Sequence, residues 1–214
     1  ELAQSLFLDM FGDPVTNPKG WEVKPLGKVC LSFNGFAFKS HDFEKHGVPV
    51  VRMSNFDSGP VDIDSAVCVS REIADSKEKF SVERGDFLIA LSGATTGKFG
   101  LFQHSKRAML NQRIAALRLE SNHTEIMKFG FFIELMKHVS KGIYDMAMGA
   151  AQPNVSLNDI REIEVFLPPV GSQEAFVKRH DEINRFKGAL LEAAMGSEEL
   201  FNALLQKAFK GELT

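Results

Sequence analysis

The two ends of this chain resemble each other, and this likeness constrains the fold more than any single motif. Residues 1–11, ELAQSLFLDMF, align without a gap with residues 199–209, ELFNALLQKAF. Glu, Leu, Leu and Phe are identical at matching places, and apolar residues recur with helical spacing in both segments. Self-similarity at a long period indicates a duplicated unit. Two unrelated Leu-rich helices are the alternative, and the matching terminal Phe favours the repeat.

The rest of the sequence is that of a globular protein. The chain has 214 residues, begins with Glu rather than Met, and is expected to be a piece of a longer protein. No apolar run is long enough to span a membrane, and no secretory signal is visible. Cys30 and Cys68 are too few for a disulfide framework, so we expect buried free thiols and a cytoplasmic location.

Positive charge is concentrated in one segment. Residues 87–119 contain five basic residues and no acid, within a chain of net charge −3. This pattern suggests contact with a polyanion. The alternative is a solvated face whose carboxylates come from elsewhere in the fold, and charge alone favours that alternative. The five residues are Lys98, Lys106, Arg107, Arg113 and Arg118.

Periodicity predicts an α+β fold with a β-rich middle. A first helix should end near Phe11, because Gly12-Asp13-Pro14 follows. Short apolar runs bounded by Gly, Asp and Asn predict strands, and a helical pattern returns between them. The predicted strands are 48–51, 87–91, 114–119 and 163–167, and the predicted helix is 125–138.

Residues 173–210 predict one long helix. It would span about 57 Å at ~1.5 Å per residue. Apolar residues recur at heptad spacing, although polar seam positions, Gly188 and Gly196 make the coiled coil imperfect. We expect it to pair with another helix; folding back at Gly196 is the alternative. The predicted pairing residues are Phe176, Ile183, Leu190, Phe201 and Leu204.

No motif for catalysis, cofactor binding or metal binding stands out. The segment Ser92–Lys98, SGATTGK, lacks the spacing of a phosphate-binding loop, since three residues separate its glycines and Phe99 follows the Lys. It is equally well a tight turn or a phosphate contact through Lys98. Phenylalanines 33, 36, 38 and 43 lie among polar residues and could stack on bases, but a core role is favoured.

Several short motifs, taken in order, resemble one family. They are Trp21 with Pro25-Leu26-Gly27, Gly47–Arg52, Gly85–Ile89, Ser92-Gly93, Leu110–Gln112, Gln152–Ser156, and Pro168-Pro169 leading to Gln173. Their order and spacing resemble a target-recognition domain plus one conserved helix of a type I restriction–modification specificity subunit. Gly171-Ser172 departs from the family pattern, which usually has Glu before the Gln. The family's usual chain has two recognition domains and two helices, whereas this chain has one of each.

The resemblance implies a division of the chain and a role. Residues 1–19 would end a preceding conserved helix, 20–170 would form a compact β-rich recognition domain, and 171–214 would form a spacer helix pairing like a coiled coil. The resemblance implies binding of double-stranded DNA, reading one half of a split site without a cofactor or catalysis. Its implied partners are adenine methyltransferase (M) subunits, the restriction (R) subunit through them, and a second copy or second half through the long helix.

Two other hypotheses remain open. The chain could be the specificity end of a fused restriction–methylation enzyme, or a helical module whose β-rich domain binds protein.

Polar residues near the predicted turns are the candidate DNA contacts. Arg suits guanine, and Asn or Gln suits adenine. For Asn111, Gln112 and Asn154 we favour a role as core amides holding loops, because they belong to the shared motifs. The candidates are Lys39, Ser40, Arg52, Asn55, Thr95, Thr96, Lys98, Arg107, Asn111, Gln112 and Arg113.

Overall fold

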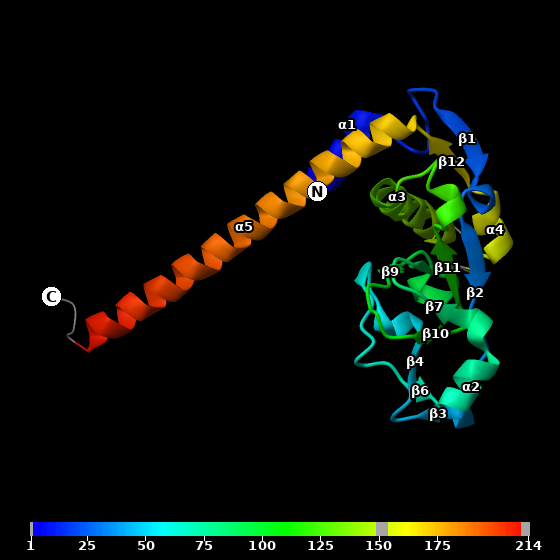
Figure 1. The fold of residues 1–214 in the computed structure, drawn as a ribbon, viewed down its shortest axis with the longest axis horizontal. Coiled ribbons are helices and arrows are strands. Elements are labelled where there is room, and N and C mark those ends of the chain that lie inside the picture. The colour runs from blue at the N-terminus through cyan, green and yellow to red at the C-terminus, as the bar shows by residue number, and fades with distance from the viewer. Residues whose placement is uncertain (1, 149–153, 211–214) are drawn as a thin grey trace.

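The computed structural model describes residues 2–148 and 154–210, and it has the predicted α+β class (Figure 1). Glu1 of the repeat and Gln152 and Pro153 of the sequence motifs lie outside the described residues. The helices are α1 (Leu2–Phe11), α2 (Arg71–Ser76), α3 (Phe129–Met148), α4 (Leu157–Glu162) and α5 (Val170–Phe209). The strands are β1 (Glu22–Pro25), β2 (Leu31–Asn34), β3 (Phe43–Glu44), β4 (Val48–Val51), β5 (Gly59–Pro60), β6 (Cys68–Val69), β7 (Ser81–Val82), β8 (Phe87–Ala90), β9 (Phe99–Leu101), β10 (Ala108–Leu110), β11 (Ile114–Arg118) and β12 (Glu164–Leu167).

Two five-stranded sheets form the centre of the β-rich domain. One has the order β2-β11-β8-β9-β5 and the other β3-β6-β4-β10-β7, while β1 and β12 pair separately. Residues 114–117 of β11 are buried on both faces: Ala115 and Leu117 pack toward α3, and Ile114 and Ala116 pack into a second core with Val51 of β4. Burial on both faces explains why this strand appears in the sequence as a continuous apolar run.

An aromatic core joins the two ends of the domain. Phe7 and Phe11 of α1 are fully buried against Phe131 of α3, Phe166 of β12 and Phe176 of α5. The proposed divisions near residues 19 and 170 therefore run through one continuous core, because α1, β12 and the start of α5 all contribute to it.

The first helix ends where its sequence predicts. Gly12 adopts φ +83°, and a Cβ there would lie 2.6 Å from the Pro18 ring, so the chain leaves α1 at this glycine. The helix predicted at 125–138 instead begins at Phe129 and continues to Met148. Residues 121–123 form a 3₁₀ turn, and the Lys128 amide donates to Oε1 of Gln173, 2.8 Å away, which fixes the start of α3 against α5.

The long helix α5 is unbroken over forty residues. It passes through Gly188 and Gly196 without a bend and extends away from the domain (Figure 1), so the fold-back alternative is wrong. Within the described part of the chain, no helix combines the length and apolar character that spanning a membrane requires. Cys30 and Cys68 are free thiols and buried, as predicted, and burial raises the pKa of Cys30 to about 12.

Candidate nucleic-acid interface

Three loops that follow strands of the two sheets meet at one edge of the domain. They are residues 52–58 after β4, 92–98 after β8 and 111–113 after β10, and we call them the strand-end loops. The Asn111 amide donates to the Val51 carbonyl over 3.0 Å, and the Leu91 amide donates to the Arg113 carbonyl over 2.9 Å. The Thr95 hydroxyl lies 3.2 Å from the sulfur of Met53. These contacts connect all three loops.

The turn at 92–98 is held by α3. Gly93 and Gly97 have φ of +77° and +82°, a backbone conformation that glycine adopts without strain. The Ser140 hydroxyl donates to the Gly97 carbonyl, and a Cβ on Gly97 would lie within 2.7 Å of the Tyr144 backbone. The glycines of this segment therefore allow a tight turn docked on a helix, which is the first of its two predicted interpretations.

Several predicted DNA contacts lie in or beside the strand-end loops. Lys39, Ser40, Gln112 and Arg113 are exposed, and Arg52, Thr95 and Asn111 are half-buried. The Phe36 carbonyl accepts from the Gln112 amide over 3.0 Å, whereas Lys39 and Ser40 come after Phe36, where the chain runs toward Phe43 of β3, level with the start of β4. The strand-end loops thus bring together six accessible candidates: Arg52, Thr95, Lys98, Asn111, Gln112 and Arg113.

Two candidates are internal. Asn55 is 3% exposed: its Oδ1 accepts from the Arg52 amide and its Nδ2 donates to Ser65. Thr96 is 2% exposed, and its hydroxyl donates to the Gly93 carbonyl. Both side chains shape their own loops, so their prediction as DNA contacts is wrong for this conformation.

Carboxylates from elsewhere neutralise much of the basic segment. Lys98 pairs with Asp57 at 2.8 Å, Arg107 with Asp75 at 2.5 Å, and Arg118 with Asp86 at 2.7 Å. Pairing with carboxylates from elsewhere is thus correct for these three cations, although the Arg118–Asp86 pair is mostly buried and is not part of a solvated face. Arg107 precedes β10 while the 111–113 loop follows it, so Arg107 also lies at the opposite end of that strand.

Two basic residues of the segment, Lys106 and Arg113, form no ion pair with any residue that the structure describes. Arg113 is the one of the two that lies in a strand-end loop. Buried polar atoms add to that edge: Nε of Arg52 and Oγ of Ser92 have no hydrogen-bond partner among the described residues. The edge therefore offers the exposed, unpaired cation of Arg113 to a polar ligand, while the two unsatisfied atoms are buried beside it.

The predicted core amides Asn111, Gln112 and Asn154 hold their loops through backbone contacts. Gln112 and Asn154 are exposed, so the prediction of buried core amides is wrong for these two. Asn154 instead forms a backbone bridge with Ser92, and Asn111 forms one with Phe36. These bridges connect motifs that lie far apart in the sequence.

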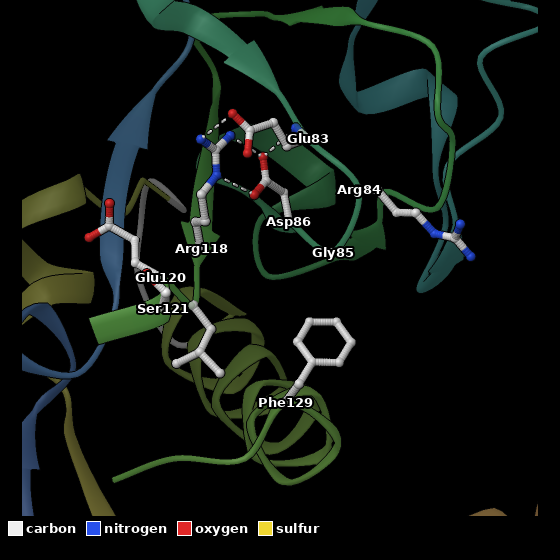
Figure 2. A pocket seen from close by; sticks show the side chains of 9 residues that line it. Glu83, Arg84, Gly85, Asp86, Arg118, Glu120, Ser121 and Phe129 are labelled. Carbon is white, nitrogen blue, oxygen red and sulfur yellow. Dashed lines mark hydrogen bonds and ion pairs between the residues drawn. The ribbon is translucent and has the colours of Figure 1, made fainter. Parts of the chain in front are cut away.

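A separate cavity surrounds Arg118 (Figure 2). Its guanidinium donates to both carboxylate oxygens of Asp86 and to Glu83, and the Ser81 carbonyl accepts from it over 3.2 Å. Burial raises the pKa of Asp86, and the hydrogen bonds from Arg118 oppose that rise. Two cations, Arg84 and Arg118, line this cavity together with three carboxylates, Glu83, Asp86 and Glu120, and Arg118 is paired, so the lining favours no phosphate. The sequence analysis quoted the Gly85-Asp86 turn of this cavity as part of a motif, but it did not predict the cavity.

The predicted pairing residues of α5 divide into two groups. Leu190, Phe201 and Leu204 are exposed and Ile183 is half-buried, which suits a helix that lacks its partner. Phe176 is fully buried in the aromatic core of its own domain. In that core it packs on Phe7 and Phe11 of α1, so its helix contact lies within this chain, and its pairing with a second copy stays a prediction.

Known proteins share this sequence pattern and fold. The family model described as "Type I restriction modification DNA specificity domain" matches residues 18–193. The Type I restriction enzyme EcoBI specificity subunit of Escherichia coli is 23% identical over 92% of this chain, and the EcoAI specificity subunit is 24% identical over 91%. The chain spans 43% and 34% of the length of these two relatives.

A solved structure has the same fold. The HsdS subunit from Thermoanaerobacter tengcongensis superposes with a TM-score of 0.67 at 22% sequence identity, covering 99% of this chain and 51% of that one. The family match covers most of the described residues, including the strands, the strand-end loops and the first half of α5. This chain belongs to the family of type I restriction–modification DNA specificity domains.

Proposed function

We propose that this chain binds double-stranded DNA and reads one half of a split recognition sequence for a type I restriction–modification system. The observation that carries the proposal is the gathering of six accessible polar candidates in the strand-end loops of a domain whose family match covers residues 18–193. Proteins read DNA with polar side chains and with cations that contact phosphates. The strand-end loops supply both kinds of group.

Arg113 and Gln112 are the residues that we propose read bases. Both are exposed at neighbouring positions of one loop, and the backbone hydrogen bonds to Leu91 and Phe36 hold that loop in place. Arg binds the guanine edge through two hydrogen bonds, and Gln binds the adenine edge in the same way. Lys39 and Ser40 would contact phosphates on one side, and Lys98 on the other.

The remaining roles follow from the family. The chain would carry no catalytic group of its own and would position adenine methyltransferase subunits, and through them a restriction subunit, in the cytoplasm. Helix α5 would pair with a second copy or a second half. Methyl transfer from S-adenosylmethionine to DNA by the chain without a partner would instead favour the fused-enzyme alternative.

Selection of duplexes from a random pool tests the proposal. The protein should enrich one half-site, and its affinity should fall steeply with salt because bound phosphates release counterions. Arg113→Ala should relax the choice at one base pair and cost about 1–3 kcal/mol. Arg107→Ala is the matched control, since Arg107 pairs with Asp75 at the other end of β10.

The two variants should differ clearly in the selected sequence. If Arg113→Ala and Arg107→Ala select the same site with the same affinity as the parent chain, the strand-end loops are not the DNA-reading surface. If no duplex is enriched from the pool, the proposed DNA recognition fails as a whole.

A further inference from the structure

One face of α3 supports the turn at residues 92–98. Ser140 and Tyr144 are four residues apart, so they lie on the same face of this helix. The Ser140 hydroxyl donates to the Gly97 carbonyl, and a Cβ on Gly97 would lie 2.6 Å from the Tyr144 amide nitrogen. The turn therefore rests directly on the backbone of α3, and the glycine at position 97 leaves the room that this contact needs.

The hydrogen bond of Ser140 is not the one that a serine inside a helix commonly makes. Such a hydroxyl usually points to solvent or returns to the carbonyl four residues earlier in its own helix. Ser140 is 2% exposed, and its hydroxyl instead reaches a carbonyl 43 residues away in the sequence. The bond therefore serves the turn rather than the helix.

This bond fixes the peptide unit that precedes Lys98. The Gly97 carbonyl and the Lys98 N–H belong to one planar unit. Ser140 holds the carbonyl, and the N–H donates to the Thr95 carbonyl over 2.9 Å. The Lys98 carbonyl accepts in turn from the Ala90 amide over 2.9 Å. The backbone of Lys98 is thus held on both sides, which sets the direction in which its side chain leaves the turn.

The side chain of Lys98 itself is free to change its partner. Its Nζ lies 2.8 Å from the carboxylate of Asp57, whose side chain is 75% exposed. Exchange of this carboxylate for a DNA phosphate needs only rotations within the side chain, because the backbone is already fixed. A group held in this way loses less conformational entropy on binding than a group on a loose loop.

We propose that Ser140 is a positioning residue for DNA binding, whose hydroxyl fixes the Gly97–Lys98 peptide so that the ammonium group of Lys98 meets a DNA phosphate. The inference rests on the proposed function and adds to it a buried residue that does not touch DNA. Without the bond from Ser140, the peptide unit can rotate and the ammonium group samples directions away from the phosphate. No local sequence pattern predicts this role, because the two partners come from distant segments.

The salt dependence of DNA affinity tests the proposal on the full chain, with the half-site selected from the random pool as the probe. Each neutralised phosphate contributes about 0.9 to the slope of log K against log salt concentration. Lys98→Ala should remove about this much from the slope. Ser140→Ala should lower the slope in the same direction and weaken binding about threefold to tenfold. The selected half-site should stay the same, because a phosphate contact carries no base preference.

Ser32→Ala is the matched control. Ser32 is also a buried serine, 5% exposed, and its hydroxyl accepts from Nε of Arg161 on α4 over 2.8 Å. The substitution removes a bond between two elements, but neither partner belongs to a strand-end loop. Ser32→Ala should therefore keep the parent slope, whatever it costs in stability, which urea unfolding measures for both serine variants.

A double-variant cycle shows whether Ser140 acts through Lys98. In the Lys98→Ala background, Ser140→Ala should change the affinity less than about twofold, because the group that it positions is gone. In the Arg113→Ala background it should keep its full effect. Gly97→Ala disrupts the same contact from the side of the turn and should lower the slope as well. It replaces Ser140→Ala in the cycle if circular dichroism shows that Ser140→Ala is unfolded.

Three results would overturn the positioning role: the parent slope in the folded variant, an equal fall in slope for Ser32→Ala, or additive losses for that variant and Lys98→Ala. A parent chain that selects its half-site while giving any of these results would defeat the positioning role alone. A parent chain that binds no duplex would defeat the proposed function, and the positioning role with it.

Discussion

The guanidinium of Arg118 donates two hydrogen bonds to the carboxylate of Asp86, one to each oxygen and each 2.7 Å long (Figure 2). The Asp86 side chain is 1% exposed, and its Oδ2 also accepts from the Glu83 amide over 2.8 Å. This pair joins the turn before β8 to the end of β11, and these two strands are neighbours in their sheet. Arg118 therefore stabilises the domain and is not free to bind DNA.

Removing Asp86 should be strongly destabilising. Asp86→Ala would leave a partly buried guanidinium without its main partner, which costs about 3–5 kcal/mol for pairs of this kind. Urea unfolding followed by circular dichroism measures the change. Glu83→Ala is the control, because Glu83 contacts the same guanidinium at 2.9 Å but is largely exposed, and exposed pairs contribute about 0–1 kcal/mol. Equal losses for the two variants would contradict the role assigned to Asp86.

The stability of the chain should fall at mildly acidic pH because of His138. Its ring stacks on Phe7 with centroids 4.7 Å apart, and burial lowers its pKa below 6.5. The unfolded chain binds a proton on this residue more readily than the folded chain does. The stabilisation is therefore complete above pH ~6.5 and is lost as the pH falls through the lowered pKa.

His138→Phe keeps a flat ring on Phe7 but removes the titration. The measurement is the free energy of unfolding between about pH 7.5 and pH 5, where histidines titrate. The parent chain should lose more stability than the variant over this range. Curves of the same slope would show that His138 does not carry the effect, and the comparison of slopes is unaffected by a constant packing cost.

Asp57 should act as a competitor of DNA for Lys98. The two side chains form an ion pair at 2.8 Å, with Asp57 largely exposed, so a phosphate must displace the carboxylate. Asp57→Asn should raise DNA affinity by about two- to fivefold, as expected for an exposed pair of up to ~1 kcal/mol. Asp64→Asn removes the same charge from an exposed site nearby in sequence and serves as the control.

Fluorescence anisotropy with the selected half-site gives both affinities. The gain should vanish in the double variant Asp57→Asn/Lys98→Ala. A gain of the same size for Asp64→Asn would point to net charge rather than to the release of Lys98.

The sequence predicted those parts of the fold in which a pattern repeats over several residues. The strands at 48–51 and 114–118 and the helices ending at Phe11 and Phe209 follow from apolar runs and periodicity. Strands of two residues such as β5 and β6 have no periodicity to detect. They exist because tertiary neighbours pair with their backbones.

The sequence predicted which types of residue lie near the strand-end loops, but it did not predict which of their side chains are exposed to a ligand. Asn55 and Arg113 are both polar residues beside turns, yet one is buried within its loop and the other is exposed. The difference depends on partners such as Ser65 and on the packing of the loop, which no local pattern encodes. Arg107 likewise forms an ion pair with Asp75, which lies far from it in the sequence.

The last prediction concerns α5 as a ruler between two recognition domains. It follows from the unbroken helix, in which residues 193–202 are exposed and which runs away from its own domain (Figure 1). Seven residues inserted after Glu192 rotate the apolar face by only about 20° from two full turns and add roughly 10 Å. The spacer between the half-sites should then lengthen by about three base pairs, since DNA rises 3.4 Å per base pair. Each half-site should stay the same.

A two-residue insertion at the same place is the control for the ruler. It adds only ~3 Å but turns the apolar face by about 200°, so pairing through α5 should be lost. Selection from a random pool gives the spacer, and sedimentation velocity shows whether each variant is paired. An unaltered spacer, selected by a heptad-insertion protein that is folded and paired, would mean that the separation of the half-sites is not set by α5.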